Sequence, residues 1–129
     1  MTISITPLYA GLIALLFITL SIRVIKVRRG DKISLGDGGR SDMAYRVRAQ
    51  ANCAEYAPMG LILLAMAEMQ GAPVWVVHIL GLMLLVGRVM HGWGMSQSPQ
   101  NLPARVYGMM LTLAMITFTA IANIGHALF

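Results

Sequence analysis

The sequence has little charge and almost no cysteine. Only 12% of its 129 residues are charged, whereas soluble domains carry about twice that fraction. Its single cysteine, Cys53, excludes an internal disulfide and a metal site built from several cysteines. The apolar neighbours of Cys53 predict a small buried side chain. Because 57% of the residues are hydrophobic and the mean hydropathy is +0.70, we predict an integral membrane protein.

The charge that is present is mostly positive. Ten Lys and Arg residues outnumber five Asp and Glu residues, which gives a net charge of +5. In a soluble chain this excess would suggest binding to nucleic acid. Here the basic residues flank apolar segments, as they do in membrane proteins. We therefore expect the lipid bilayer as a partner and no nucleic acid.

Four apolar segments approach the ~20 residues that cross a bilayer. The first lacks the basic start and the small-residue cleavage site of a signal peptide, so we expect it to be retained. The pattern predicts an all-α, four-helix transmembrane bundle that forms a single domain over residues 1–129. The helices are expected at residues 3–27, 42–69, 73–95 and 103–128.

The three connections differ in character. Residues 28–42 are rich in glycine and aspartate, which predicts a loop. Residues 70–73 predict a tight turn, because Gly71 can cap one helix and Pro73 can open the next. Residues 96–103 contain two prolines and predict a short loop.

A polar stripe opens the second predicted helix. Arg48, Asn52 and Glu55 are spaced at i, i+4 and i+7, so their side chains are expected on one face. Facing lipid, they would cost several kcal/mol, so we expect the stripe to face protein, water or a ligand. We also expect Arg48 and Glu55 to lie deep in the bundle.

Further cations are expected at the same end of the bundle. Arg88, His91 and Met95 share a face near the end of the third helix. Arg105 lies in the predicted first turn of the fourth, where the helix dipole favours an anion and disfavours a cation. A cation at that position suggests an anion nearby.

Two interpretations of these charges remain open. Arg48, Arg88 and Glu55 could neutralise one another as a structural cluster of ion pairs. Alternatively, they line one cleft that holds an anionic ligand. The excess of arginine favours the second interpretation, since Arg48, Arg88 and Arg105 meet a single carboxylate at that depth. We predict no metal site, because neither His78 nor His126 has a partner at ligand spacing. Each of these two histidines is expected to hydrogen-bond between helices or to lie at an interface.

These motifs resemble the MAPEG family, the membrane-associated proteins in eicosanoid and glutathione metabolism. The most specific is "RVRAQANCAEYAP" at residues 46–58. Supporting motifs are "VIKVRR" at 24–29, "GRVMHGWG" at 87–94 and "PARVYG" at 103–108. The short chain and its basic first loop are typical of a bacterial branch of that family.

The resemblance implies a homotrimer that binds glutathione as a co-substrate between neighbouring subunits. It implies catalytic roles for Arg105 and Arg88, with Arg105 stabilising the thiolate. Arg28 or Arg29 would reach the ligand from a neighbouring subunit. The other residues implied to bind glutathione are Arg48, Gln50, Asn52, Glu55, Tyr56 and His91.

The function implied by the resemblance is that of a glutathione-dependent transferase or peroxidase-like protein. A glutathione thiolate would attack a lipophilic electrophile or reduce a hydroperoxide. One departure from the family is Met95, which stands where glutathione-using members often have a tyrosine. The alternatives are therefore a non-catalytic protein that binds lipid or a thiol, or a small four-helix exporter of cations that uses Glu55. The surrounding arginines disfavour an exporter, since they repel cations.

Our first prediction concerns orientation across the bacterial inner membrane. All ten basic residues lie in or near the first and third connections, and basic loops stay in the cytoplasm. Both termini should therefore lie on the non-cytoplasmic side. A reporter that fluoresces only in the cytoplasm, fused after Phe129, should leave cells dark. Bright cells would contradict the assignment.

Overall fold

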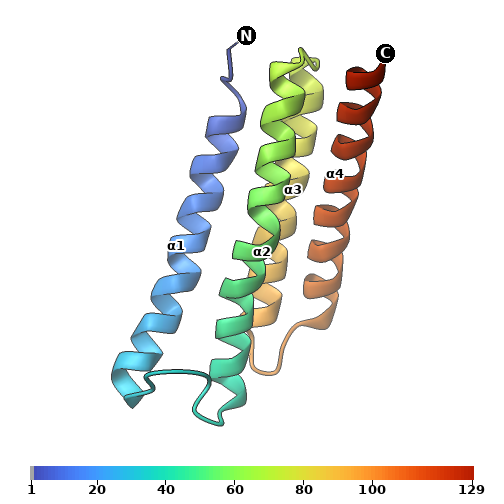
Figure 1. The fold of residues 1–129 in the computed structure, drawn as a ribbon. Coiled ribbons are helices and arrows are strands. Elements are labelled where there is room, and N and C mark those ends of the chain that lie inside the picture. Colours follow the sequence, from blue (N-terminus) through green and yellow to red (C-terminus); the bar gives the residue numbers. More distant parts are fainter. Residues whose placement is uncertain (1) are drawn as a thin grey trace.

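The computed structural model describes residues 2–129, and these contain four long α-helices. The helices run up and down in turn, so that both termini lie at one end and the first and third connections at the other (Figure 1). We call the end that carries the first and third connections the loop end. The all-α, four-helix prediction is confirmed. The elements are α1 (Thr6–Asp31), α2 (Ser41–Met69), α3 (Val74–Ser96) and α4 (Leu102–Leu128).

Three of the helices, α1, α3 and α4, are long and apolar enough to span a membrane. The remaining helix, α2, has 29 residues, which is also sufficient length. Polar residues in its first half, among them Arg46 and Arg48, lower its hydropathy. The helix that departs from a simple membrane span is thus the one that carries the most specific motif.

The first helix extends further than we predicted. It continues through Arg28, Arg29 and Gly30 to Asp31, because Arg is a good helix former and a single glycine weakens a helix without ending it. Lys32 then adopts a left-handed conformation with φ 54°, and its N–H donates to the Arg28 carbonyl. The loop itself is therefore limited to residues 32–40. The turn before α3 agrees with prediction, since Gly71 has φ 87° and Pro73 precedes the helix.

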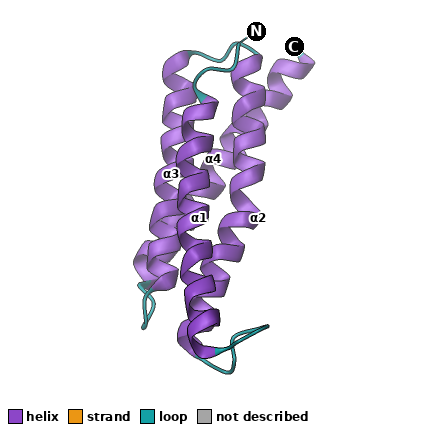
Figure 2. Cartoon of the chain, turned by 90° about the vertical axis from the view of Figure 1, so that its left-hand side faces the viewer, coloured by secondary structure: helices purple, strands orange, loops and turns teal. Residues whose placement is uncertain are grey.

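Two helices form the centre of the bundle. α2 and α3 pack against each other and each contacts both α1 and α4, whereas α1 and α4 do not meet within the described chain. Figure 2 shows the elongated bundle that results. Large apolar side chains fill the middle, including the fully buried Leu64, Leu84 and Met115. A cleft forms where α4 packs against α2 and α3.

The α3 and α4 backbones approach closely at two glycines. A Cβ atom added to Gly108 would lie 2.5 Å from the His91 nitrogen and 2.6 Å from the Gly87 carbonyl oxygen. Small residues allow membrane helices this proximity, which increases packing and hydrogen bonding between them. Gly108 therefore sets how near α4 comes to His91 and its neighbours.

At the end opposite the loops, polar contacts hold α1 to the bundle. The Glu68 carboxylate of α2 accepts hydrogen bonds from the backbone N–H groups of Ser4, Ile5 and Thr6 at 2.7–2.8 Å. It thus satisfies donors at the start of α1 that the helix itself cannot. Further along, the Tyr9 hydroxyl lies 2.9 Å from the His78 Nδ1 atom. This confirms His78 as a residue that hydrogen-bonds between helices.

We predict that Gly108→Ala lowers the melting temperature in mild detergent. The added methyl group meets backbone atoms of α3, which cannot rotate away, so the free energy of unfolding should fall by about 1–3 kcal/mol. The matched control is Gly125→Ala on the same helix, where the new Cβ has no neighbour within 4 Å. That variant should melt no lower than the parent. Equal melting temperatures for both variants would contradict the close packing.

Candidate functional site

The centre of the site is Arg88, which is only 1% exposed to solvent. Its Nη1 atom donates to the Asn52 Oδ1 atom at 2.6 Å, and its Nε atom donates to the Thr112 Oγ1 atom at 2.9 Å. The guanidinium carbon also lies 5.5 Å from the centre of the Tyr56 ring, within the range of a cation–π interaction. Arg88 of α3 therefore connects α2 and α4 through one buried group.

The partners of Arg88 are neutral. Among residues 2–129, no Asp or Glu oxygen lies within 4.0 Å of its guanidinium group. Hydrogen bonds from neutral groups orient a buried cation, but they do not cancel its charge. Of the cluster in which Arg48, Arg88 and Glu55 neutralise one another, the Arg48–Glu55 pair forms, whereas Arg88 has no carboxylate partner among the described residues.

Next to Arg88, a cleft of about 430 Å³ opens between α2, α3 and α4 toward the loop end. One part of its wall is polar and the other is apolar. The polar residues are Arg48, Asn52, His91 and Arg105. The apolar residues are Met95, Leu102, Val106, Met109 and Met110.

Arg105 occupies the first turn of α4, as predicted. Its Nη1 atom donates to the Gln100 Oε1 atom at 2.8 Å, which orients the side chain at the rim of the cleft. The Asn101 side chain caps the same helix by accepting from the Ala104 N–H at 3.2 Å. Neither Gln100 nor Thr112 was predicted from the sequence as a residue of the site. Thr112 could have been noticed as a hydroxyl two turns after Arg105 in an apolar helix.

The polar stripe of α2 divides between two directions. Asn52 points inward and is 8% exposed. Arg48 and Glu55 form an ion pair at 3.4 Å, and their side chains are 53% and 52% exposed. The expectation that these two lie deep in the bundle is therefore wrong for a single chain. Four residues turn a helix about 40° past a full circle, and this rotation brings Asn52 toward α3 while Arg48 and Glu55 stay on the outer face.

The remaining predicted residues lie outside the cleft of one chain. Tyr56 packs beneath Arg88, and Gln50 is half-buried on α2. Arg28 and Arg29 are at the end of α1, which does not reach α4, and the Arg28 Nη1 atom donates to the Gly36 carbonyl at 2.9 Å. Any contact of Arg28 or Arg29 with a ligand in the cleft would have to come from another copy of the chain.

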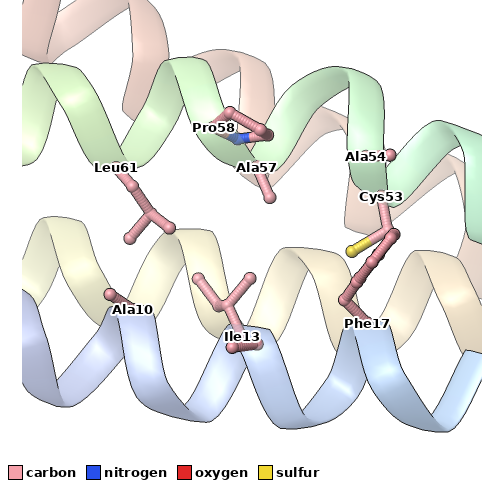
Figure 3. A pocket seen from close by; sticks show the side chains of 9 residues that line it. Ala10, Ile13, Phe17, Cys53, Ala54, Ala57, Pro58 and Leu61 are labelled. Carbon is pink, nitrogen blue, oxygen red and sulfur yellow. The ribbon is translucent and has the colours of Figure 1, made fainter.

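A second, smaller cavity of about 230 Å³ lies between α1 and α2 (Figure 3). It is lined by a different face of α2 from the cleft, since the two walls share no residue of that helix. Cys53 is buried, as predicted. The cavity has no charged side chain in its wall, so it offers nothing to an anion. Its lining is Ala10, Ile13, Ala14, Phe17, Cys53, Ala54, Ala57, Pro58 and Leu61.

The comparison with known proteins identifies the family. The sequence profile of the MAPEG family matches residues 6–125, which include nearly all of the four helices. Two similar proteins come from Escherichia coli, strains K12 and O6:H1 (CFT073), and each is named inner membrane protein YecN. Each is 36% identical over 122 residues, which cover 95% of this chain and 92% of the relative. The chain therefore belongs to the MAPEG family, and it is an all-helical membrane protein with a cleft rich in arginine.

Proposed function

We propose that this protein activates a glutathione thiolate against a lipophilic electrophile or hydroperoxide. The observation that carries the proposal is the positive charge around one cleft, where Arg48 and Arg105 line the wall and Arg88 lies behind it without a carboxylate. Glutathione has two carboxylates and one ammonium group at neutral pH, so it is a net anion. Its charge is complementary to the cleft.

The residues of the cleft match the functional groups of the tripeptide. Arg48 binds a carboxylate and Asn52 offers its amide, while Glu55, paired with Arg48 on the outer face of α2, accepts from the ammonium group. His91 lines the same cleft from α3. In the proposed complex, Gln50 and Tyr56 add contacts from α2, and a neighbouring subunit contributes an arginine from the end of α1.

Arg105 is the residue that we assign to the sulfur. A cation beside the sulfur favours the thiolate over the thiol, and the thiolate is the nucleophile. In transfer, the thiolate forms a bond to the electrophilic carbon and the leaving group departs with its electron pair. In peroxide reduction, two glutathione molecules supply two electrons and two protons, and the products are a disulfide, an alcohol and water.

The apolar part of the cleft suits a lipophilic acceptor. Val106, Met109 and Met110 project from α4 beside Arg105, so an apolar molecule and the sulfur would meet in one space. Methionine side chains adapt to acceptors of different shape. Met95 also lines this space, and its thioether cannot donate a hydrogen bond to the sulfur, so activation depends on arginine.

A second candidate function is non-catalytic binding of a thiol or lipid. Met95 favours it, since a family tyrosine is missing at that position. Export of cations is a weaker candidate, because Arg48 and Arg105 in the wall of the cleft repel a cation. A turnover assay separates binding from catalysis.

We also propose a homotrimer in the bacterial inner membrane. The Arg48 and Glu55 side chains form an ion pair on α2 and are 53% and 52% exposed. Charged groups in that position are costly if they face lipid. A second copy of the chain would cover them and would also supply the arginine from α1. The inner membrane is the location that the name of the relative YecN states.

We predict that the purified protein conjugates glutathione to a generic aryl halide and that Arg105→Ala reduces the rate at least tenfold. That loss corresponds to about 1.4 kcal/mol of transition-state stabilisation. The melting temperature and most of the glutathione affinity should remain, because Arg105 lies at the rim of the cleft. Arg105→Lys, which keeps the charge, should recover part of the rate. Turnover of Arg105→Ala at the parent rate would remove the thiolate role from Arg105 and make Arg88 the next candidate.

We predict that native mass spectrometry in mild detergent finds mainly trimers. Glu55→Ala should reduce the trimer fraction, because the outward Arg48 loses its carboxylate partner at the surface that we assign to the interface. Glutathione should also no longer raise the melting temperature of this variant. A parent protein that is mainly monomer or dimer would count against the proposed assembly.

A further inference from the structure

An exposed apolar stripe on α1 runs directly into a group of cations. Ile18, Ile22 and Ile25 are exposed and spaced at i, i+4 and i+7, so they form one face of the helix. Continued from Ile25 with the same spacing, this face reaches Arg29 and Lys32. An apolar surface thus ends in positive charge at the loop end of the bundle.

A cavity of about 470 Å³ lies at that point, between the end of α1 and the loop that follows. Its wall combines three cations and a hydroxyl group with two isoleucines and contains no carboxylate. The lining residues are Ile25, Arg28, Arg29, Lys32, Ile33 and Ser34. The chemistry of the wall is complementary to an anion that carries an apolar chain.

The carboxylates nearby are already engaged. Arg40 forms ion pairs with Asp31 and with Asp42, the second at 2.8 Å. The Asp37 Oδ1 atom accepts from the Gly39 N–H at 2.8 Å. These contacts hold the loop in place and leave the charges of Arg29 and Lys32 uncompensated by Asp31 or Asp37.

Two features of the loop indicate that its side chains have a use at the membrane. Lys32 adopts a left-handed backbone with φ 54°, where glycine is normally favoured. A strained position that keeps a long cation suggests that the cation itself is needed. Leu35 is 87% exposed in the loop, so an apolar group is available to contact the bilayer surface.

We propose that an anionic phospholipid binds to this face of α1. Its phosphate lies in the cavity with Arg29, Lys32 and Ser34, and one acyl chain lies along Ile18, Ile22 and Ile25. A lipid fits better than a free phosphate because the apolar stripe is continuous with the cavity. Basic pockets beside membrane helices bind such headgroups.

This site goes beyond the proposed glutathione chemistry and does not depend on it. Arg28 and Arg29 are consecutive, so their side chains point about 100° apart on the helix. Arg29 follows the exposed apolar stripe, whereas Arg28 turns toward the loop and donates to Gly36.

The test compares lipids on the purified protein in detergent. Short-chain phosphatidylglycerol should raise the melting temperature and remain bound in native mass spectrometry, and phosphatidylcholine of the same chain length should do so much less. Lys32→Gln should weaken phosphatidylglycerol binding at least fivefold. Lys32→Gly also removes the charge but suits the left-handed backbone. It should weaken phosphatidylglycerol binding to the same extent, because the lysine charge binds the lipid and the backbone conformation is preserved. Lys26→Gln is the matched control: it removes an exposed cation outside the cavity wall and should change binding less than twofold.

Several outcomes would overturn the proposal. Equal responses to both lipids, or equal losses in the Lys26 and Lys32 variants, would mean that no defined headgroup site exists. Full saturation by glycerol phosphate would indicate a site for free phosphate. Displacement of the lipid by glutathione would assign Arg29 to the proposed glutathione site in place of the lipid site. Since none of these measurements uses turnover, they can fail while the proposed function stands, and the reverse is also true.

Discussion

The packing of the helices depends on the buried guanidinium group of Arg88, whose hydrogen-bond partners are all uncharged. Arg88 donates to Asn52 on α2 and to Thr112 on α4, so one side chain sets the relative position of three helices. An isolated buried charge is costly unless something compensates for it. The amide, the hydroxyl and the Tyr56 ring reduce that cost without removing the charge. The interaction that joins the helices is therefore also the source of the positive potential in the cleft.

The antiparallel topology concentrates the remaining charge. Each of the three turns reverses the chain, so the ends of α1 and α3 meet the starts of α2 and α4 at the loop end (Figure 1). Arginines from separate parts of the sequence thereby reach one region. The close contact at Gly108 brings α4 near enough to α3 for Arg105 and His91 to share one wall. The opposite end has no lysine or arginine, and Glu68 is occupied by α1.

The sequence predicted the helices well because hydrophobic length alone determines where a chain can span a bilayer. It also predicted Arg105 in a first helical turn, since Pro103 marks a helix start. It did not predict the partners of Arg88, because a contact between separate helices depends on how each is rotated. For the same reason it placed Arg48 and Glu55 too deep: the spacing shows that side chains share a face, but not which neighbour covers that face.

The Glu68 contact bears on how the protein assembles as it enters the membrane. The start of α1 receives its hydrogen-bond acceptor from a carboxylate 62–64 residues later in the chain. Until α2 has crossed to the same side, the first backbone N–H groups of α1 have only water as a partner. The first two helices thus complete each other as a hairpin, and the cap can form only once Glu68 has reached the end of the bundle opposite the basic loop. Secondary structure at the beginning of the chain is in this way finished by a residue near its middle.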